Sequence, residues 1–428
     1  MKTITYPVKE AWDKLCIRPA VDKTGLDETI KSILNDVKKL GDKALNDYSL
    51  KYDNVKLDEI EIPEKEIKES ENQIDDDVKE AIDIAVKNIE KFHRAQLYRE
   101  EVVETMPGIK CRRKNVAVEK VGLYIPGGTA PLFSSVLMLA IPAKIAGCKQ
   151  VVMCTPPDRE GKINPLILYA ASLSGVTGIY RVGGAQAVAA MAYGTETVPR
   201  VYKIFGPGNQ YVTRAKELVQ CDGATIDMPA GPSEVLVIAD DAADPEFVAA
   251  DLLSQAEHGT DSQVVLLTDS KNLMDRVMSE IEKQLACLPR KEIAGQALEN
   301  SSLILLHDPG ECIEFSNMYA PEHLILNTAN ASELADKVIN AGSVFIGKYS
   351  CESAGDYASG TNHTLPTNGF AKSFSGVSID SFVKKITFQE ISREGLKRIG
   401  PAIEIMADAE LLSGHSNSVK LRLEKETE

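Results

Sequence analysis

The sequence predicts an α/β protein with two Rossmann-like units, each of them incomplete. From residue 115, short β-branched runs alternate with Ala- and Leu-rich helical runs, and the alternation starts again at residue 234. This order is typical of βαβ units with a largely parallel sheet. We therefore expect an N-terminal, mainly helical region (1–114), two α/β units (115–233 and 234–369) and a C-terminal helical extension (370–428).

The flanking regions are assigned from their periodicity. Apolar residues recur every three or four positions in residues 26–53 and 76–96, a spacing that predicts amphipathic helices. The last ~50 residues return to the same helical patterning.

Each α/β unit is expected to alternate strands and helices. The strands of the first unit are predicted at 116–126, 150–157, 178–184 and 200–208, with helices at 134–148, 166–175 and 187–194. The strands of the second unit are predicted at 234–240, 263–269, 302–308, 324–326 and 343–347, with helices at 245–259 and 272–288. The similar strands 150–155 and 263–268 hold equivalent places, which fits a duplication or convergent strand composition about equally.

Composition limits the partners and the compartment. Lysine and arginine number 48 against 63 acids, and the net charge of -15 argues against a nucleic-acid partner. No apolar run approaches the ~18 residues of a membrane span, and no export signal is visible at the start. Eight scattered cysteines without a CxxC pair indicate reduced, structural thiols. We expect a cytoplasmic enzyme without a membrane partner.

Two short motifs bring histidine close to polar partners. Gln255 and His258 are three residues apart near the end of a predicted helix capped by Gly259, so both could reach one metal ion from one face. Glu322 and His323 follow Pro321 directly before an apolar strand, where a carboxylate and an imidazole can act as general acid and base. A capping histidine and a solvated Glu-His pair would produce the same two patterns.

The loop 350–369 is rich in small residues and contains Asp356 and His363. A long loop of this composition has no packing reason to exist, which favours a functional role such as binding a metal ion or a substrate amine. Further along, Glu410 and His415 lie at the end of a C-terminal helix.

Glycine turns follow three predicted strands, at Gly127-Gly128, at Gly183-Gly184 and in the run FGPGN. They are compatible with a dinucleotide lying across the sheet edge, although no full GxGxxG is present and plain tight turns would look the same.

Several long motifs resemble the histidinol dehydrogenase family. They are VGLYIPGGTAPLFSSVLMLAIPAKIAGC, RVGGAQAVAAMAYGTETVP, KIFGPGN, DMPAGPSEVLVIAD, DLLSQAEHG, PEHLI and SAGDYASGTNHTLPT, within a similarity that covers roughly residues 30 to 420. The resemblance implies oxidation of L-histidinol to L-histidine with two NAD⁺, the last step of histidine biosynthesis. It also implies a homodimer with one Zn²⁺ per subunit, and it places NAD in the first α/β unit and the metal ion and substrate in the second.

The resemblance also implies roles for individual residues. The zinc ligands would be Gln255, His258, Asp356 and His415, the last reaching in from the partner subunit. The acid–base pair would be Glu322 and His323. The substrate contacts would be Ser233, Gln255, His258, His323, Asp356, His363, Glu410 and His415. The NAD contacts would be Tyr124, Gln186 and Asn209.

Two residues depart from the family pattern. Cys351 stands where proline is common, and Gly414 precedes His415 where alanine is usual, which leaves the orientation of His415 open. Two other function classes also fit part of the motifs. A zinc hydrolase would explain the histidines and acids but not the glycine turns, and a non-catalytic binding protein would not need the Glu322–His323 pair.

Overall fold

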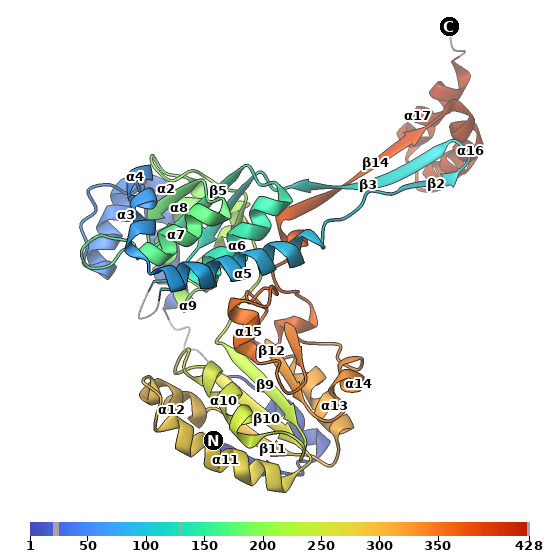
Figure 1. Cartoon of the computed structure of the whole chain (residues 1–428). Helices are drawn as coiled ribbons and strands as arrows, with labels where there is room; N and C mark the ends of the chain where they lie inside the picture. Colours follow the sequence, from blue (N-terminus) through green and yellow to red (C-terminus); the bar gives the residue numbers. More distant parts are fainter. Residues whose placement is uncertain (20–24, 128–130, 426–428) are drawn as a thin grey trace. The chain divides into compact units, whose positions relative to one another are not determined.

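The computed structural model describes residues 1–19, 25–127 and 131–425, so Gly128 of the first glycine turn lies outside the described residues (Figure 1). The chain forms two compact units, one from Met1–Gln96 and Val118–Phe382, the other from Leu97–Ala117 and Val383–Glu428. The larger unit contains two parallel sheets, and this confirms the predicted α/β fold with two Rossmann-like sheets. Among the described residues, no helix has the length and apolar character needed to cross a membrane.

The first sheet is a five-stranded parallel sheet. Its strand order is β6 (Gly178–Arg181), β5 (Gln150–Thr155), β4 (Lys120–Tyr124), β7 (Lys203–Phe205) and β8 (Thr225–Ile226). In chain order this is 3-2-1-4-5, so the topology reverses between β4 and β7, the point where α/β sheets bind nucleotides at their carboxyl ends.

Helices cover both faces of this sheet, which explains why its strands are nearly continuous apolar runs. In β5, Val152 and Cys154 pack into one layer and Val151 and Met153 into the other. The first layer contains α2 (Leu26–Leu40), α3 (Asp42–Tyr48), α8 (Gly184–Tyr193) and α9 (Gln210–Val219). The second contains α4 (Glu64–Ser70), α5 (Asp76–Arg94), α6 (Phe133–Ala146) and α7 (Pro165–Ser174).

The second sheet repeats this topology with one strand added. Its order is β1 (Lys2–Thr5), β11 (Ser302–Leu305), β10 (Gln263–Thr268), β9 (Glu234–Ala239), β12 (His323–Asn327) and β13 (Ser343–Ile346). All pairs are parallel. Without β1 the order is again 3-2-1-4-5, and β5 and β10, the two similar sequence runs, hold the same position in their sheets.

Two helical layers also cover the second sheet. One face packs against α10 (Pro245–Ala256), α11 (Lys271–Leu285) and α12 (Lys291–Glu299). The opposite face packs against Trp12 of α1 (Trp12–Leu15), α13 (Pro309–Tyr319) and α14 (Ala331–Ala335). The short helix α15 (Glu352–Tyr357) lies in the loop after β13.

The smaller unit is an antiparallel sheet with two helices. The sheet has the order β14 (Val383–Ile391), β3 (Ile109–Ala117), β2 (Val102–Met106), and the helices are α16 (Arg393–Ala409) and α17 (Ser413–Glu424) (Figure 1). The helical patterning of the flanking regions did not predict these three strands. Most of their residues are exposed on both faces, and charged and apolar residues occur on both, so the period of two is weak. The domain boundaries at 114, 233 and 369 stay a prediction.

A proline inside α6 creates an attachment point for the loop that follows β13. Pro142 has no N–H, so the carbonyl of Met138, four residues earlier, lacks its helical partner. The side-chain amide of Asn362 donates a hydrogen bond to this carbonyl at 2.5 Å. The loop 350–369 is thereby tied to a helix of the first sheet.

This pairing predicts a measurable coupling between Pro142 and Asn362. Asn362→Ala leaves the buried Met138 carbonyl unpaired and should cost about 1–3 kcal/mol of stability. Pro142→Ala supplies a new N–H to that carbonyl, so it should stabilise the Asn362→Ala protein more than it stabilises the wild type. Thermal unfolding of all four proteins measures the difference, and equal effects in both backgrounds would exclude the coupling.

Candidate active site and metal centre

Glu322 and His323 lie at the amino end of β12 (His323–Asn327), directly after a sharp turn at Ala320 and Pro321. Helix α13 closes with Ala320 in the left-handed region (φ 55°, ψ 68°), which is unusual for a residue with a Cβ. Pro321 follows, and His323 then begins β12 opposite Val235 of β9. Both side chains are buried, so the pair is not the solvated Glu-His pair that its sequence also allowed.

The main chain of Glu234, the first residue of β9, holds the pair. Its N–H donates to Glu322 Oε2 (2.9 Å), and its carbonyl lies 3.1 Å from His323 Nδ1. A carbonyl only accepts, so this contact requires a proton on Nδ1. Gln255 Nε2, itself a donor, also lies 3.2 Å from Nδ1, and its two hydrogens have the Glu234 carbonyl (3.2 Å) and Glu322 Oε2 (3.4 Å) as acceptors.

The surroundings change the acidity of both groups. Burial raises the pKa of Glu322 to about 7. Burial alone would lower the pKa of His323, but the carboxylates of Glu352, Glu322 and Asp356 outweigh it and raise this pKa to about 10. The site therefore concentrates negative charge around one imidazole, an environment that favours a cation.

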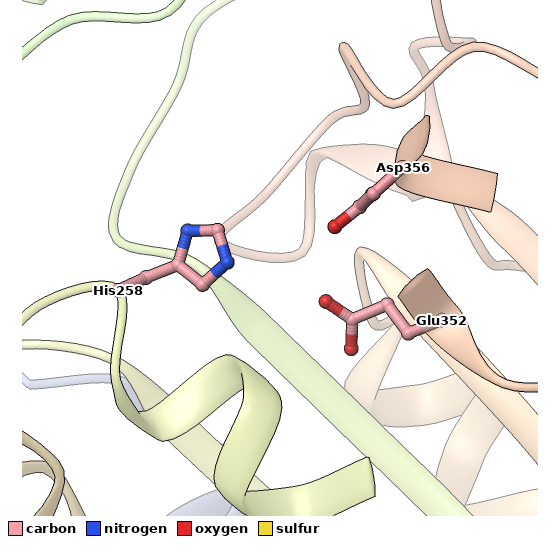
Figure 2. A group of neighbouring side chains, drawn as sticks. All are labelled: His258, Glu352 and Asp356. Carbon is pink, nitrogen blue, oxygen red and sulfur yellow. The ribbon is translucent and has the colours of Figure 1, made fainter. Parts of the chain in front are cut away.

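Three side chains beside this pair could hold a metal ion. Each of His258, Glu352 and Asp356 offers one ligand atom, and these atoms all lie within 4.8 Å of one another (Figure 2). His258 follows the last turn of α10, which is capped by Glu257 and not by Gly259 as expected. Glu352 and Asp356 are one turn apart on α15. The motifs did not single out Glu352, although its spacing of four from Asp356 places both on one helix face.

Unpaired buried atoms mark where a ligand would fit. Gln255 Oε1, His323 Nε2 and Glu352 Oε2 are buried and have no hydrogen-bond partner within the part of the chain that the structure describes. His323 Nε2 lies 3.7 Å from Asp356 Oδ1, at ion-pair distance. Buried polar atoms are rarely left without a partner, so these atoms fit a metal ion and a polar substrate. A nitrogen, an amide oxygen and carboxylates are a donor set that suits zinc.

The remaining predicted substrate residues fall into two groups. His363 is fixed in the larger unit, where Nδ1 contacts the Asp356 carbonyl (3.0 Å) and Nε2 contacts Ser135 Oγ of α6 (3.2 Å). Ser233 directly precedes β9. Glu410 and His415 belong to the smaller unit, where Glu410 caps α16 and His415 is exposed in the first turn of α17.

Neither departure from the expected pattern strains the backbone. Cys351 precedes α15 with φ −77°, close to the angle that proline would impose. A Cβ added at Gly414 would meet nothing within 4 Å, so this position does not require glycine.

The predicted cofactor residues gather at the carboxyl edge of the first sheet. Tyr124 ends β4, and its hydroxyl accepts the N–H of Gly184, at the start of α8. Gln186 is buried in the first turn of that helix. Asn209 caps α9 through hydrogen bonds from two backbone N–H groups. Gly206 has φ +119°, and a Cβ there would lie 2.0 Å from the Tyr124 carbonyl, so only glycine allows this close approach.

A buried ion pair supports the same turn. Lys216 Nζ lies 2.5 Å from Asp227 Oδ1 and donates to the Gly206 carbonyl (2.8 Å), while the Gly206 N–H donates to Asp227 Oδ2 (2.8 Å). Both peptide groups of Gly206 are thereby fixed, and with them the start of the GPGN turn.

Comparisons with known proteins show the family of this chain. A family profile described as Histidinol dehydrogenase matches residues 16–423. The chain is 60% identical over 423 residues to "Histidinol dehydrogenase" of Bacteroides thetaiotaomicron, covering 99% of both, and 54% identical to that of Escherichia coli K12, covering 96% of this chain and 94% of that protein. The crystal structure of histidinol dehydrogenase from Elizabethkingia anophelis superposes with a TM-score of 0.97 at 54% identity, covering 99% of this chain and 98% of that one. The chain belongs to the histidinol dehydrogenase family.

Proposed function

We propose that this chain oxidises L-histidinol to L-histidine through the bound aldehyde, with two NAD⁺, as the last step of histidine biosynthesis. The observation that carries the proposal is the buried imidazole of His323. Its Nδ1 faces the Glu234 carbonyl, and its Nε2 is left unpaired beside Asp356 and the candidate metal ligands. A proton acceptor next to a cation site is what the oxidation of an alcohol requires.

The metal ion is proposed to be one zinc per subunit, held by Gln255, His258, Asp356 and His415. The unpaired Gln255 Oε1 and the closely spaced His258 and Asp356 support three of these ligands. Glu352 is a further candidate ligand from the same cluster. When bound, the ion supplies an anchor for the imidazole and amine of the substrate.

His323 and Glu322 would divide the proton transfers. With a cation in the site to offset the charge of Glu352 and Asp356, the imidazole of His323 would be neutral, and its Nε2 would take the proton of the alcohol in the first oxidation, while bound NAD⁺ supplies the hydride acceptor. Glu322 activates the water that adds to the aldehyde, and a pKa raised by burial to about 7 suits a carboxylate that must accept a proton near neutral pH. The burial of both groups keeps bulk water away from the two side chains that move protons.

The other predicted contacts complete the proposal. Tyr124, Gln186 and Asn209 would contact NAD at the switch point of the first sheet, which is the usual place for a dinucleotide. Ser233, His363 and Glu410 would contact the substrate with the metal ligands. His363 is supported by its contact with the Asp356 main chain.

A homodimer and a cytoplasmic location are also proposed. The smaller unit exposes many apolar side chains, as a surface that packs against a second copy would; they include Val102, Val103, Met106, Phe388, Ile405, Met406 and Leu411. All eight cysteines are free, which fits a reducing compartment.

The activity and its metal requirement are tested together. Histidinol and NAD⁺ should produce NADH, followed by its absorbance; a chelator should abolish the reaction, and added zinc should restore it, because the substrate then regains its anchor. Turnover of a hydrolase substrate without NAD⁺ would favour a zinc hydrolase instead. Binding of histidinol without any turnover would favour a non-catalytic protein.

The division of labour between Glu322 and His323 predicts different defects in the two half-reactions. Glu322→Gln should slow the oxidation of the aldehyde much more than the exchange between alcohol and aldehyde, because only the former needs water. His323→Asn should slow both, by ~10²–10⁴-fold, since each needs a proton acceptor. Equal damage to both steps by Glu322→Gln, measured by single-turnover NADH formation, would contradict the assignment.

The sharing of His415 between subunits predicts complementation. His258→Asn and His415→Asn should each be inactive alone. After subunit exchange, a mixed dimer with shared sites has one site with both defects and one with neither, so about half of the activity per mixed dimer should return. If His415 acts within its own chain, every site keeps one defect. Exchange demonstrated by mass spectrometry without recovery of NADH formation would therefore rule out sharing.

A further inference from the structure

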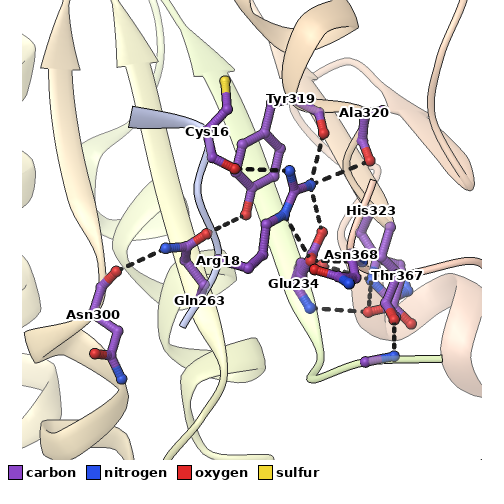
Figure 3. Close-up of polar contacts among 12 residues, drawn as sticks. Cys16, Arg18, Glu234, Gln263, Asn300, Tyr319, Ala320, His323, Thr367 and Asn368 are labelled. Carbon is purple, nitrogen blue, oxygen red and sulfur yellow. Dashed lines mark hydrogen bonds and ion pairs between the residues drawn. The ribbon is translucent and has the colours of Figure 1, made fainter. Parts of the chain in front are cut away.

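Arg18, which none of the sequence motifs included, binds the residue whose main chain contacts the proposed acid–base pair. Its guanidinium binds the Glu234 carboxylate with two parallel hydrogen bonds, from Nε and Nη2, each of 3.0 Å (Figure 3). The Arg18 side chain is 10% exposed and that of Glu234 is 1% exposed. Two parallel bonds to a buried carboxylate need the planar fork of arginine, which lysine does not have.

The same guanidinium also holds the turn that precedes Glu322. Nη2 donates to the carbonyls of Tyr319 (2.7 Å) and Ala320 (3.4 Å), and the guanidinium lies over the Tyr319 ring, 3.6 Å from its centre. Ala320 is the residue in the left-handed conformation. A non-glycine residue keeps such a conformation only where its surroundings enforce it, and Arg18 is part of those surroundings.

Glu234 links Arg18 to the side chains of Glu322 and His323. Its carboxylate accepts the bonds from Arg18 and the N–H of Asn368 (2.8 Å). Its own N–H and carbonyl contact Glu322 Oε2 and His323 Nδ1. One cation therefore holds both neighbours of the pair, the first residue of β9 and the turn before β12.

We propose that Arg18 is a positioning residue for the Glu322–His323 pair. It sets the peptide of Glu234, which orients the carboxylate of Glu322 and keeps the proton of His323 on Nδ1, so that Nε2 faces the substrate site. Among the described residues, the hydrogen bonds of Arg18 go to Cys16, Glu234, Tyr319 and Ala320, none of which is a proposed metal ligand. The proposal rests on the proposed function of the pair.

The test compares variants of Arg18 with a control in the same network. Arg18→Met should lower kcat in both half-reactions by about 10²-fold, the effect of misplacing a catalytic group by ~1 Å, with little change in the KM for histidinol. Arg18→Lys keeps the charge but not the fork and should fall in between. Tyr319→Phe is the control, because it removes the hydroxyl bond to Gln263 Oε1 (2.7 Å) and leaves the two bonds of Arg18 to Glu234 and its contact with the ring in place.

The readouts separate positioning from stability. Tyr319→Phe should lower the unfolding temperature but keep kcat near the wild-type value. In the His323→Asn background, Arg18→Met should add little to the loss in the exchange between alcohol and aldehyde, because the imidazole that it positions is already gone and Glu322 takes no part in that step. A wild-type kcat in Arg18→Met, or fully additive losses in the double variant, would overturn the proposal.

Two further results keep the test decisive. If Arg18→Met does not fold, Glu234→Gln takes its place: it weakens the same contact within an unchanged side-chain shape and should also lower kcat without raising KM. A kcat unchanged in both Arg18→Lys and Glu234→Gln would then overturn the proposal. Failure of the proposed function itself is recognised separately, since the wild-type protein would form no NADH from histidinol.

Discussion

The parallel pairing of β9 with β12 is the constraint on which the site depends. It places His323 opposite Val235, so the main chain of Glu234 comes to lie against the carboxylate of Glu322 and the imidazole of His323. The groups that orient the pair are thus peptide atoms at the start of a central strand, which is buried on both faces. A site built on such an element is held more rigidly than one carried by surface loops alone.

Charge explains why the same place suits a metal ion. Three carboxylates, Glu322, Glu352 and Asp356, surround one buried imidazole, and burial raises the pKa of two of them, Glu322 and Glu352. Gathering acids away from water is unfavourable unless a cation or a proton accompanies them. A fourth buried acid nearby, Glu234, is neutralised by its ion pair with Arg18. The need for a cation or a proton therefore concerns the other three carboxylates.

The two sheets share one topology but place the predicted site residues at opposite ends. Tyr124, Gly184 and Gly206 lie beyond the carboxyl ends of the first sheet, where α/β proteins usually bind ligands. Glu234 and His323 lie at the amino ends of the second sheet. The loop 350–369 contributes Asp356 and is tied to α6 through Asn362, so the loop connects the second sheet with a helix of the first.

The sequence alone determined the α/β class, both parallel units and the motifs of the site, because apolar periodicity and residues such as Glu322 and His323 are local signals. It did not predict β2, β3 and β14, whose residues are mostly exposed on both faces and therefore lack a clear period. The sequence also did not single out three residues whose place at the site follows only from the tertiary structure: Glu352, Glu234 and Arg18. Arg18 meets Glu234 across 216 positions of the chain, and such a contact follows from how the strands and turns pack, which no local pattern encodes.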